Sequence, residues 1–202
     1  MIFAIIINIT MDKIIIKKWV KIIPDDKLIE FSNYIRKDNF KLISNILLDT
    51  DKNDKGIKKR NTLIKFESLI DNDDFTRKTE WIYLFTINDK IVKIGGTRTG
   101  IKGRISSYLC GHHIEERGKS GDCSKTNGYI YNTFHYYLMK GYKINMYGYE
   151  LPLNEIIIKI FDKEIKIIPQ TYHAYESTFI EDYKNNYGEY PYLCDKCDPT
   201  YK

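Results

Sequence analysis

The stretch EWIYLFTINDKIVKIGGTRTG, residues 80–100, holds two short apolar runs, a polar turn between them and a glycine-rich exit. Alternating packing residues on either side of a turn are typical of a β-hairpin, so strands are predicted at 80–87 and 91–97. The second strand contains Lys93-Ile94-Gly95-Gly96, with a lysine where another apolar residue would fit. Because lysine is rarely found at a packed position, Lys93 is a candidate for a functional role and not only a structural one.

Composition limits the class of protein. The 202 residues are 43% hydrophobic, 14% aromatic and 29% charged, with a net charge of +5. A chain of this length forms one domain, or one catalytic core with a smaller appendage. The mild positive charge permits binding to a polyanion without requiring it. No stretch approaches the ~18 apolar residues that span a bilayer and no secretory signal is recognisable, so we expect no membrane partner and an intracellular protein.

The patterns before and after residue 78 differ. Residues 1–78 are predicted to form a mainly helical N-terminal appendage, because apolar residues recur there at helical spacing. These are Leu28, Phe31 and Ile35, then Leu42, Ile43, Ile46 and Leu47, then Leu63, Ile64, Phe66, Leu69 and Ile70. Residues 79–202 alternate strand and helix patterns, with an insertion at about 110–127. The predicted fold class is therefore α+β, with helices at 100–109, 127–141 and 171–187 and a second hairpin within 155–168.

The first hairpin can place a phenol beside an ammonium group. Side chains alternate between the faces of a strand. If a three-residue loop puts Thr86 opposite Lys90, then Tyr83 lies opposite Lys93. A two-residue loop would put the tyrosine and the lysine on opposite faces.

Two predicted helices carry further candidates. Arg104 and Tyr108 are four residues apart and therefore project together. Glu176 lies within an aromatic stripe, where a carboxylate is costly unless it is paired or binds a metal. Each residue alone has an ordinary explanation as a packing tyrosine, a snorkelling lysine or a surface ion pair. The order and spacing of the whole set favour a functional site.

This set resembles the motifs of the GIY-YIG nuclease superfamily. Trp81-Ile82-Tyr83 stands at the Gly-Ile-Tyr motif, and Lys93-Ile94-Gly95 stands at the Tyr-Ile-Gly motif. An arginine on the next helix and a glutamate on a later helix match Arg104 and Glu176. Two departures are the tryptophan and the lysine. The lysine, together with Tyr108, is similar to a branch containing certain type II restriction endonucleases. The resemblance spans about residues 80–195 and implies a core with a small, mainly antiparallel β-sheet flanked by helices.

The resemblance implies metal-dependent hydrolysis of phosphodiester bonds in double-stranded DNA. Tyr83 would be the general base, with its phenolate favoured by the positive charge of Lys93 and Arg104. Arg104 would hold the scissile phosphate, and Tyr108 would contact that phosphate or orient the water. Glu176 would bind Mg²⁺ or Mn²⁺. All these groups must meet in one pocket, so a Glu176 side chain on the far side of the sheet from Tyr83 and Arg104 would contradict the interpretation.

The cysteines allow a second metal hypothesis. Cys194 and Cys197 have the C-x-x-C spacing of a structural zinc site, and Cys110 and Cys123 could complete it. The alternative is free thiols in a reducing compartment.

Other functions remain open from the sequence. They are a repair, homing or mobile-element nuclease of the same superfamily, and a non-catalytic nucleic-acid-binding module with the same fold. Restriction enzymes that cut palindromes commonly act as symmetric dimers, so a homodimer is a further expectation.

Overall fold

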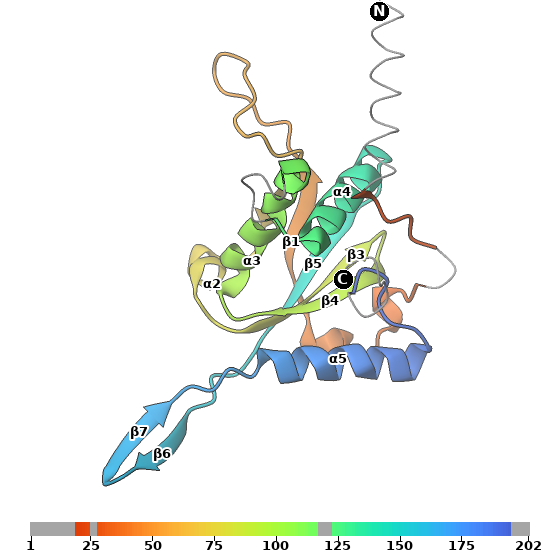
Figure 1. Ribbon diagram of the computed structural model, residues 1–202. Helices are drawn as coiled ribbons and strands as arrows, with labels where there is room; N and C mark the ends of the chain where they lie inside the picture. Colours follow the sequence, from red (N-terminus) through yellow and green to blue (C-terminus); the bar gives the residue numbers. More distant parts are fainter. Residues whose placement is uncertain (1–18, 25–27, 117–122, 195–202) are drawn as a thin grey trace, which may run out of the picture.

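The computed structural model describes residues 19–24, 28–116 and 123–194. A five-stranded antiparallel sheet with the strand order β2-β1-β5-β3-β4 forms its centre (Figure 1). The strands are β1 (Lys41–Leu48), β2 (Ile64–Ser68), β3 (Trp81–Ile87), β4 (Lys90–Thr97) and β5 (Ile144–Glu150). The α+β prediction and its mainly antiparallel sheet are confirmed.

Helices cover both faces of the sheet. They are α2 (Asn72–Thr76), α3 (Gly100–Leu109), α4 (Lys125–Met139) and α5 (Tyr172–Tyr187), with 3-10 turns η2 (Phe31–Asn33), η3 (Lys37–Asn39) and η4 (Cys110–Glu116). Helices α3 and α4 lie over one face and α5 lies over the other (Figure 1). A glycine with positive φ follows each of the two long helices, as expected: Gly188 (84°) directly after α5, and Gly141 (81°) two residues after the end of α4. No helix within the described ranges is both long and apolar enough to cross a bilayer.

The β3–β4 hairpin differs in register from the prediction. Its turn is the two-residue Asn88-Asp89, with φ of 46° and 63°, as in the type I′ turns that suit hairpins. A two-residue turn alone would separate Tyr83 from Lys93. However, a β-bulge shifts the register between Phe85 and Thr86, so that Lys93 lies opposite Phe85 and Gly95 lies opposite Tyr83. Tyr83 and Lys93 therefore share a face as diagonal neighbours, not as a directly opposed pair.

The prediction of a helical N-terminal appendage is wrong. Its second and third predicted helices are strands β1 and β2, which extend the same sheet across residue 78. A β-bulge at Ile43 explains the error, since the extra residue lets Ile43 and Ile46 face the same core although they are three apart. The first predicted helix is reduced, in its described part, to η2 and η3.

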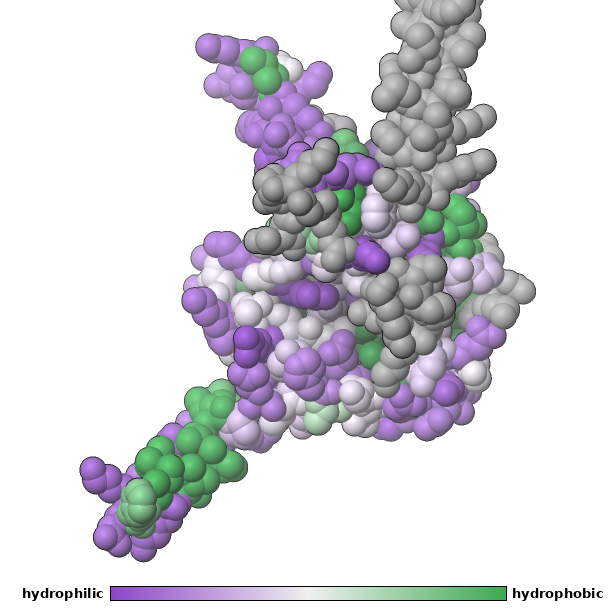
Figure 2. Space-filling model, in the orientation of Figure 1, coloured by the Kyte–Doolittle hydropathy of each residue, from purple (hydrophilic) through white to green (hydrophobic). Residues whose placement is uncertain are grey.

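The second hairpin stands apart from the body. Strands β6 (Ile156–Ile160) and β7 (Lys163–Ile167) form a separate two-stranded sheet that turns at the predicted place. Figure 1 shows it projecting away from the helices and the central sheet, and Figure 2 shows apolar residues along it.

Candidate active site

Two tyrosines and an arginine form a buried hydrogen-bonded group beneath α3. Arg104 donates through Nε to the Tyr83 hydroxyl (2.7 Å) and through Nη2 to the Tyr108 hydroxyl (2.9 Å). The two hydroxyls lie 2.7 Å apart. The Arg104 guanidinium also lies 4.4 Å from the Tyr108 ring centroid, close enough for a cation–π contact. The predicted projection of Arg104 and Tyr108 on one side of the helix is confirmed.

The titration of Tyr83 differs from the expectation. Burial raises the pKa of its phenol well above the ordinary value, and Tyr108 adds to that rise. Arg104 opposes the rise without overcoming it. Desolvation of the phenolate outweighs one neighbouring cation because no water replaces the lost hydration. Burial therefore favours the protonated phenol of Tyr83 over its phenolate.

Gly95 makes room for that phenol. A Cβ atom on Gly95 would lie 2.4 Å from the Tyr83 hydroxyl oxygen and 2.5 Å from its ring carbon Cζ. The glycine directly across the strand pair thus lets the ring lie flat over β4. This accounts for the first glycine of the pair that ends the strand.

Gly96 makes room for the Glu176 side chain on the other face of the sheet. A Cβ atom there would lie 3.2 Å from Glu176 Oε2 and 2.8 Å from the Tyr172 ring. Helix α5 thus lies on the opposite face of the sheet from α3, the arrangement that would contradict a shared site unless one pocket reached both faces. Because β4 is the edge strand and carries no side chains at these two glycines, Arg104, which binds the Tyr83 hydroxyl, and Glu176 nevertheless line one cavity at the sheet edge.

A cavity of about 390 Å³ joins the two sides, and we refer to it as the edge cavity. It is lined by Lys93, Ile94, Arg104, Ser124, Thr126, Asn127, Glu176, Ile180 and Cys194. The C-terminal segment covers β4 up to this point, through bonds from Leu193 N to Val92 O (2.7 Å) and from Cys194 Sγ to Ile94 O (3.3 Å). The edge cavity therefore opens beside the glycine pair, with Arg104 and Lys93 on its wall.

Two charged groups in the edge cavity differ in their surroundings. Lys93 is only 5% exposed and donates from Nζ to the carbonyl oxygen of Leu193 (3.1 Å). The side chain of Glu176 is 27% exposed and accepts no hydrogen bond from any described residue; its Oε2 lies 4.0 Å from the His173 ring. The carboxylate oxygens are thus available to bind a ligand from solution. A single free carboxylate facing a cavity fits a magnesium site completed by phosphate oxygens and water.

This architecture has a counterpart among solved structures. Restriction endonuclease HPY188I in complex with product DNA is 24% identical, with a TM-score of 0.51, and the match covers 84% of this chain and 88% of that one. This chain has the GIY-YIG nuclease fold. A bacteriophage T4 EndoII mutant is 22% identical over 74% of this chain and 92% of its own, with a TM-score of 0.46. No family model and no curated protein matches the sequence.

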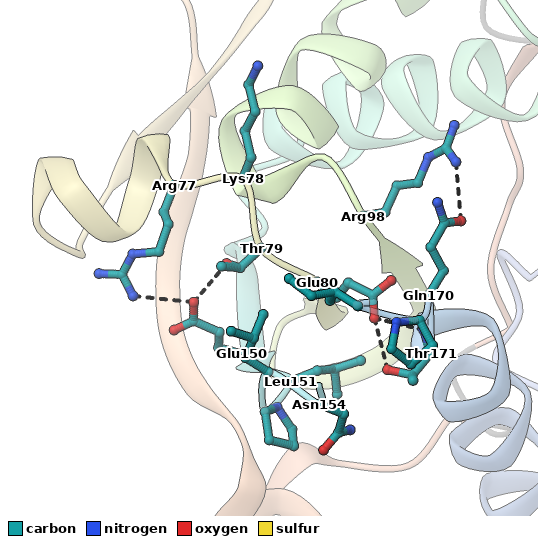
Figure 3. Close-up of a pocket in the computed structure, with 14 residues that line it drawn as sticks. Arg77, Lys78, Thr79, Glu80, Arg98, Glu150, Leu151, Asn154, Gln170 and Thr171 are labelled. Atoms are coloured by element: carbon teal, nitrogen blue, oxygen red, sulfur yellow. Dashed lines mark hydrogen bonds and ion pairs between the residues drawn. The ribbon is translucent and has the colours of Figure 1, made fainter. Parts of the chain in front are cut away.

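Within the GIY-YIG fold, one supporting residue was missed from the sequence. Glu80, directly before β3, accepts from Thr171 N (2.9 Å) and Thr171 Oγ1 (2.8 Å) (Figure 3). It also accepts from Tyr172 N (3.1 Å). It therefore caps the N-terminus of α5, the helix that carries Glu176. Helix α5 has no acidic residue in its first turn, and this lack is the feature that could have indicated a cap from elsewhere.

We expect the Glu80→Ala substitution to lower the free energy of unfolding by about 1–2 kcal/mol, because three donors at the start of α5 lose their acceptor. Glu80→Gln keeps an oxygen in place and should cost less than half as much. Urea denaturation of the two variants measures both values. Equal losses, or none, would contradict the capping role.

We expect Gly95→Ala to lower the free energy of unfolding by about 1–3 kcal/mol, because the new methyl group overlaps the Tyr83 ring. In a Tyr83→Ala background the ring is gone, so the same glycine substitution should cost little. Urea denaturation of the four proteins gives the coupling. Additive costs would show that the ring does not lie over Gly95.

The described residues offer no zinc site. Cys110 is exposed, whereas Cys123 and Cys194 are buried, and none of the three forms a disulfide bond with another described residue. The described ranges contain no group of three or more His, Cys, Asp or Glu side chains able to hold a metal. Cys197 lies outside the described residues. A site that includes Cys197 is therefore untested, and both the zinc hypothesis and the free-thiol alternative stay predictions.

Proposed function

We propose that this chain is a metal-dependent endonuclease that hydrolyses phosphodiester bonds in double-stranded DNA. The observation that carries the proposal is the meeting of Arg104, Lys93 and Glu176 in one cavity next to the Tyr83–Tyr108 pair. Two cations and one carboxylate are the charges that a phosphodiester and a divalent metal require together.

Arg104 is suited to hold the scissile phosphate. Its Nε and Nη2 are used by the tyrosines, and no described residue accepts from Nη1. The first turn of α4 adds Thr126 and Asn127 to the same wall, where the positive end of a helix favours an anion. Lys93 supplies a second cation. The tyrosines fix the plane of the guanidinium group, so the Arg104 side chain loses little conformational freedom when it binds a phosphate.

Glu176 would hold Mg²⁺ or Mn²⁺, which when bound supplies Lewis-acid stabilisation of the charge on the phosphate. Tyr83 would accept the proton of the attacking water as its phenolate, with Arg104 as the cation that opposes the raised pKa. Tyr108 donates to or accepts from the Tyr83 oxygen and would orient it. These roles, and a place in the lysine-variant restriction branch, remain proposals.

The test is a plasmid-nicking assay of the purified chain with and without Mg²⁺. The proposal expects open-circular and linear products with Mg²⁺ or Mn²⁺, and none when the metal is chelated. Binding of duplex DNA without cleavage in either metal would favour the non-catalytic binding module instead. Mapping the ends on a large defined DNA would separate a restriction enzyme from a repair, homing or mobile-element nuclease.

A further inference from the structure

The projecting hairpin has two unlike faces. We call residues 155–167 the arm. One face, fixed by the register of β6 and β7, consists of Ile156, Ile158, Ile160, Lys163, Ile165 and Ile167. The other carries Ile157 with charged residues, including the cross-strand pair Lys159–Glu164 and the ion pair Lys166–Glu155. The first face, which we call the isoleucine face, is therefore almost wholly apolar.

The isoleucine face is uncovered in the described chain. Ile156 and Ile160 remain 45% and 44% exposed, although each packs against its own hairpin neighbours. The arm pairs with no strand of the central sheet. An isolated two-stranded hairpin is only marginally stable in water, and contiguous exposed apolar surface of this kind marks a protein contact.

The tip of the arm carries an exposed aromatic ring, and the base of the arm adjoins a cavity large enough to hold one. Phe161 at the tip has φ of 54° and is 93% exposed. At the base lies a second cavity, of about 680 Å³, which we call the base cavity (Figure 3). Its wall includes Asn154 and Ile168, the residues flanking the arm, together with Leu153 and Arg98. Cavities of about 300–1,000 Å³ hold drug-sized molecules, so an aromatic ring fits.

We propose that the arm is the interface with a second copy of this chain. The isoleucine faces of two arms pack together around a two-fold axis, running in opposite directions. Strands of this length extend about 17 Å, so the tip of each arm then lies at the base of the other. Phe161 enters the partner's base cavity, and the adjacent carboxylate of Asp162 meets the cations on its rim, Arg77, Lys78 and Arg98. Such a contact is self-complementary, as a closed dimer requires.

The charges on the arm favour a protein over DNA as the binding partner of the isoleucine face. The arm carries three lysines (Lys159, Lys163 and Lys166) and three acids (Glu155, Asp162 and Glu164), so its net charge is zero. A phosphate backbone demands a positive surface, and the isoleucine face offers a single lysine. The inference is independent of the proposed function, because the dimer forms without DNA or metal.

Sedimentation velocity of the full chain without DNA, over a wide range of concentration, tests the interface. We expect a dimer, and a dissociation constant weakened at least about 100-fold by Ile160→Glu, which would bury an unpaired carboxylate. Ile157→Glu is the matched control on the charged face and should leave the dimer intact. A monomeric wild type, a dimeric Ile160→Glu variant, or equal effects of the two substitutions would overturn the proposal.

Photo-crosslinking covers the case in which Ile160→Glu misfolds. The photoreactive amino acid benzoylphenylalanine in place of Phe161 keeps the aromatic ring. We expect a covalent dimer whose adducts map to residues 151–154 or 168–171 of the second copy. Crosslinks confined to one chain, or mapping elsewhere, would show that the tip of the arm does not occupy the base cavity.

Discussion

Glu176→Gln is expected to lower the rate of DNA cleavage at least about 1,000-fold while leaving duplex binding within a few fold. A loss of that size corresponds to about 4 kcal/mol of transition-state stabilisation, a reasonable share for a metal that carries the charge of the reacting phosphate. The amide keeps the shape of the side chain against Gly96 but is a poor ligand for Mg²⁺. Single-turnover cleavage and a separate binding assay in Ca²⁺ measure the two effects.

Glu181→Gln is the matched control on the same helix. Glu181 accepts from the Tyr190 hydroxyl (3.3 Å) and lines neither the edge cavity nor the base cavity, so its amide should cut at the wild-type rate. If Glu176→Gln cleaved as fast as this control, the carboxylate would have no part in the reaction. If both variants lost DNA binding, a structural defect in α5 would be the cause.

Tyr83→Phe is expected to lower the cleavage rate by about 100- to 10,000-fold, the range that proton transfer by a positioned group contributes. The ring still fills the space over Gly95, but the oxygen that meets Arg104 and Tyr108 is gone. Since the phenol of the folded protein has a raised pKa, the wild-type rate should increase with pH across the neutral range, and that increase should be absent in the variant. A pH series of single-turnover rates measures both.

Tyr34→Phe provides the control for removal of a buried hydroxyl. Tyr34 is 1% exposed, and its hydroxyl has no hydrogen-bond partner among the described residues. Loss of that oxygen should leave both the rate and its pH dependence unchanged. A Tyr83→Phe protein that behaved like this control would leave the phenol with a packing role only.

The sequence predicted the parts of the site better than their arrangement. The β3–β4 hairpin, α3 and α5 follow from local patterns, because turn residues, helical spacing and a terminal glycine act over a few residues. The shared face of Tyr83 and Lys93 was reached through a wrong loop length. Two deviations, the short turn and the bulge, compensate for each other, and local pattern does not reveal a bulge.

Long-range pairing explains the rest. A bulge gave β1 the apolar spacing of a helix, and only its partner β5 makes it a strand. The cap from Glu80 to α5 joins residues about ninety positions apart. Similarly, the edge position of β4 was not predictable from the hairpin itself. That position lets Gly95 and Gly96 bring groups from opposite faces together, and so reconciles a helix on the far face with one shared cavity.

Binding of Mn²⁺ followed by electron paramagnetic resonance, with a non-cleavable phosphorothioate duplex, tests most directly whether the edge cavity holds metal and phosphate together. In the wild type, the duplex should tighten Mn²⁺ binding by about 10-fold. Arg104→Ala should abolish that coupling, and Glu176→Gln should abolish Mn²⁺ binding itself. If Glu176→Gln binds Mn²⁺ as tightly as the wild type, with the same response to the duplex, then the metal lies elsewhere and the shared site does not exist.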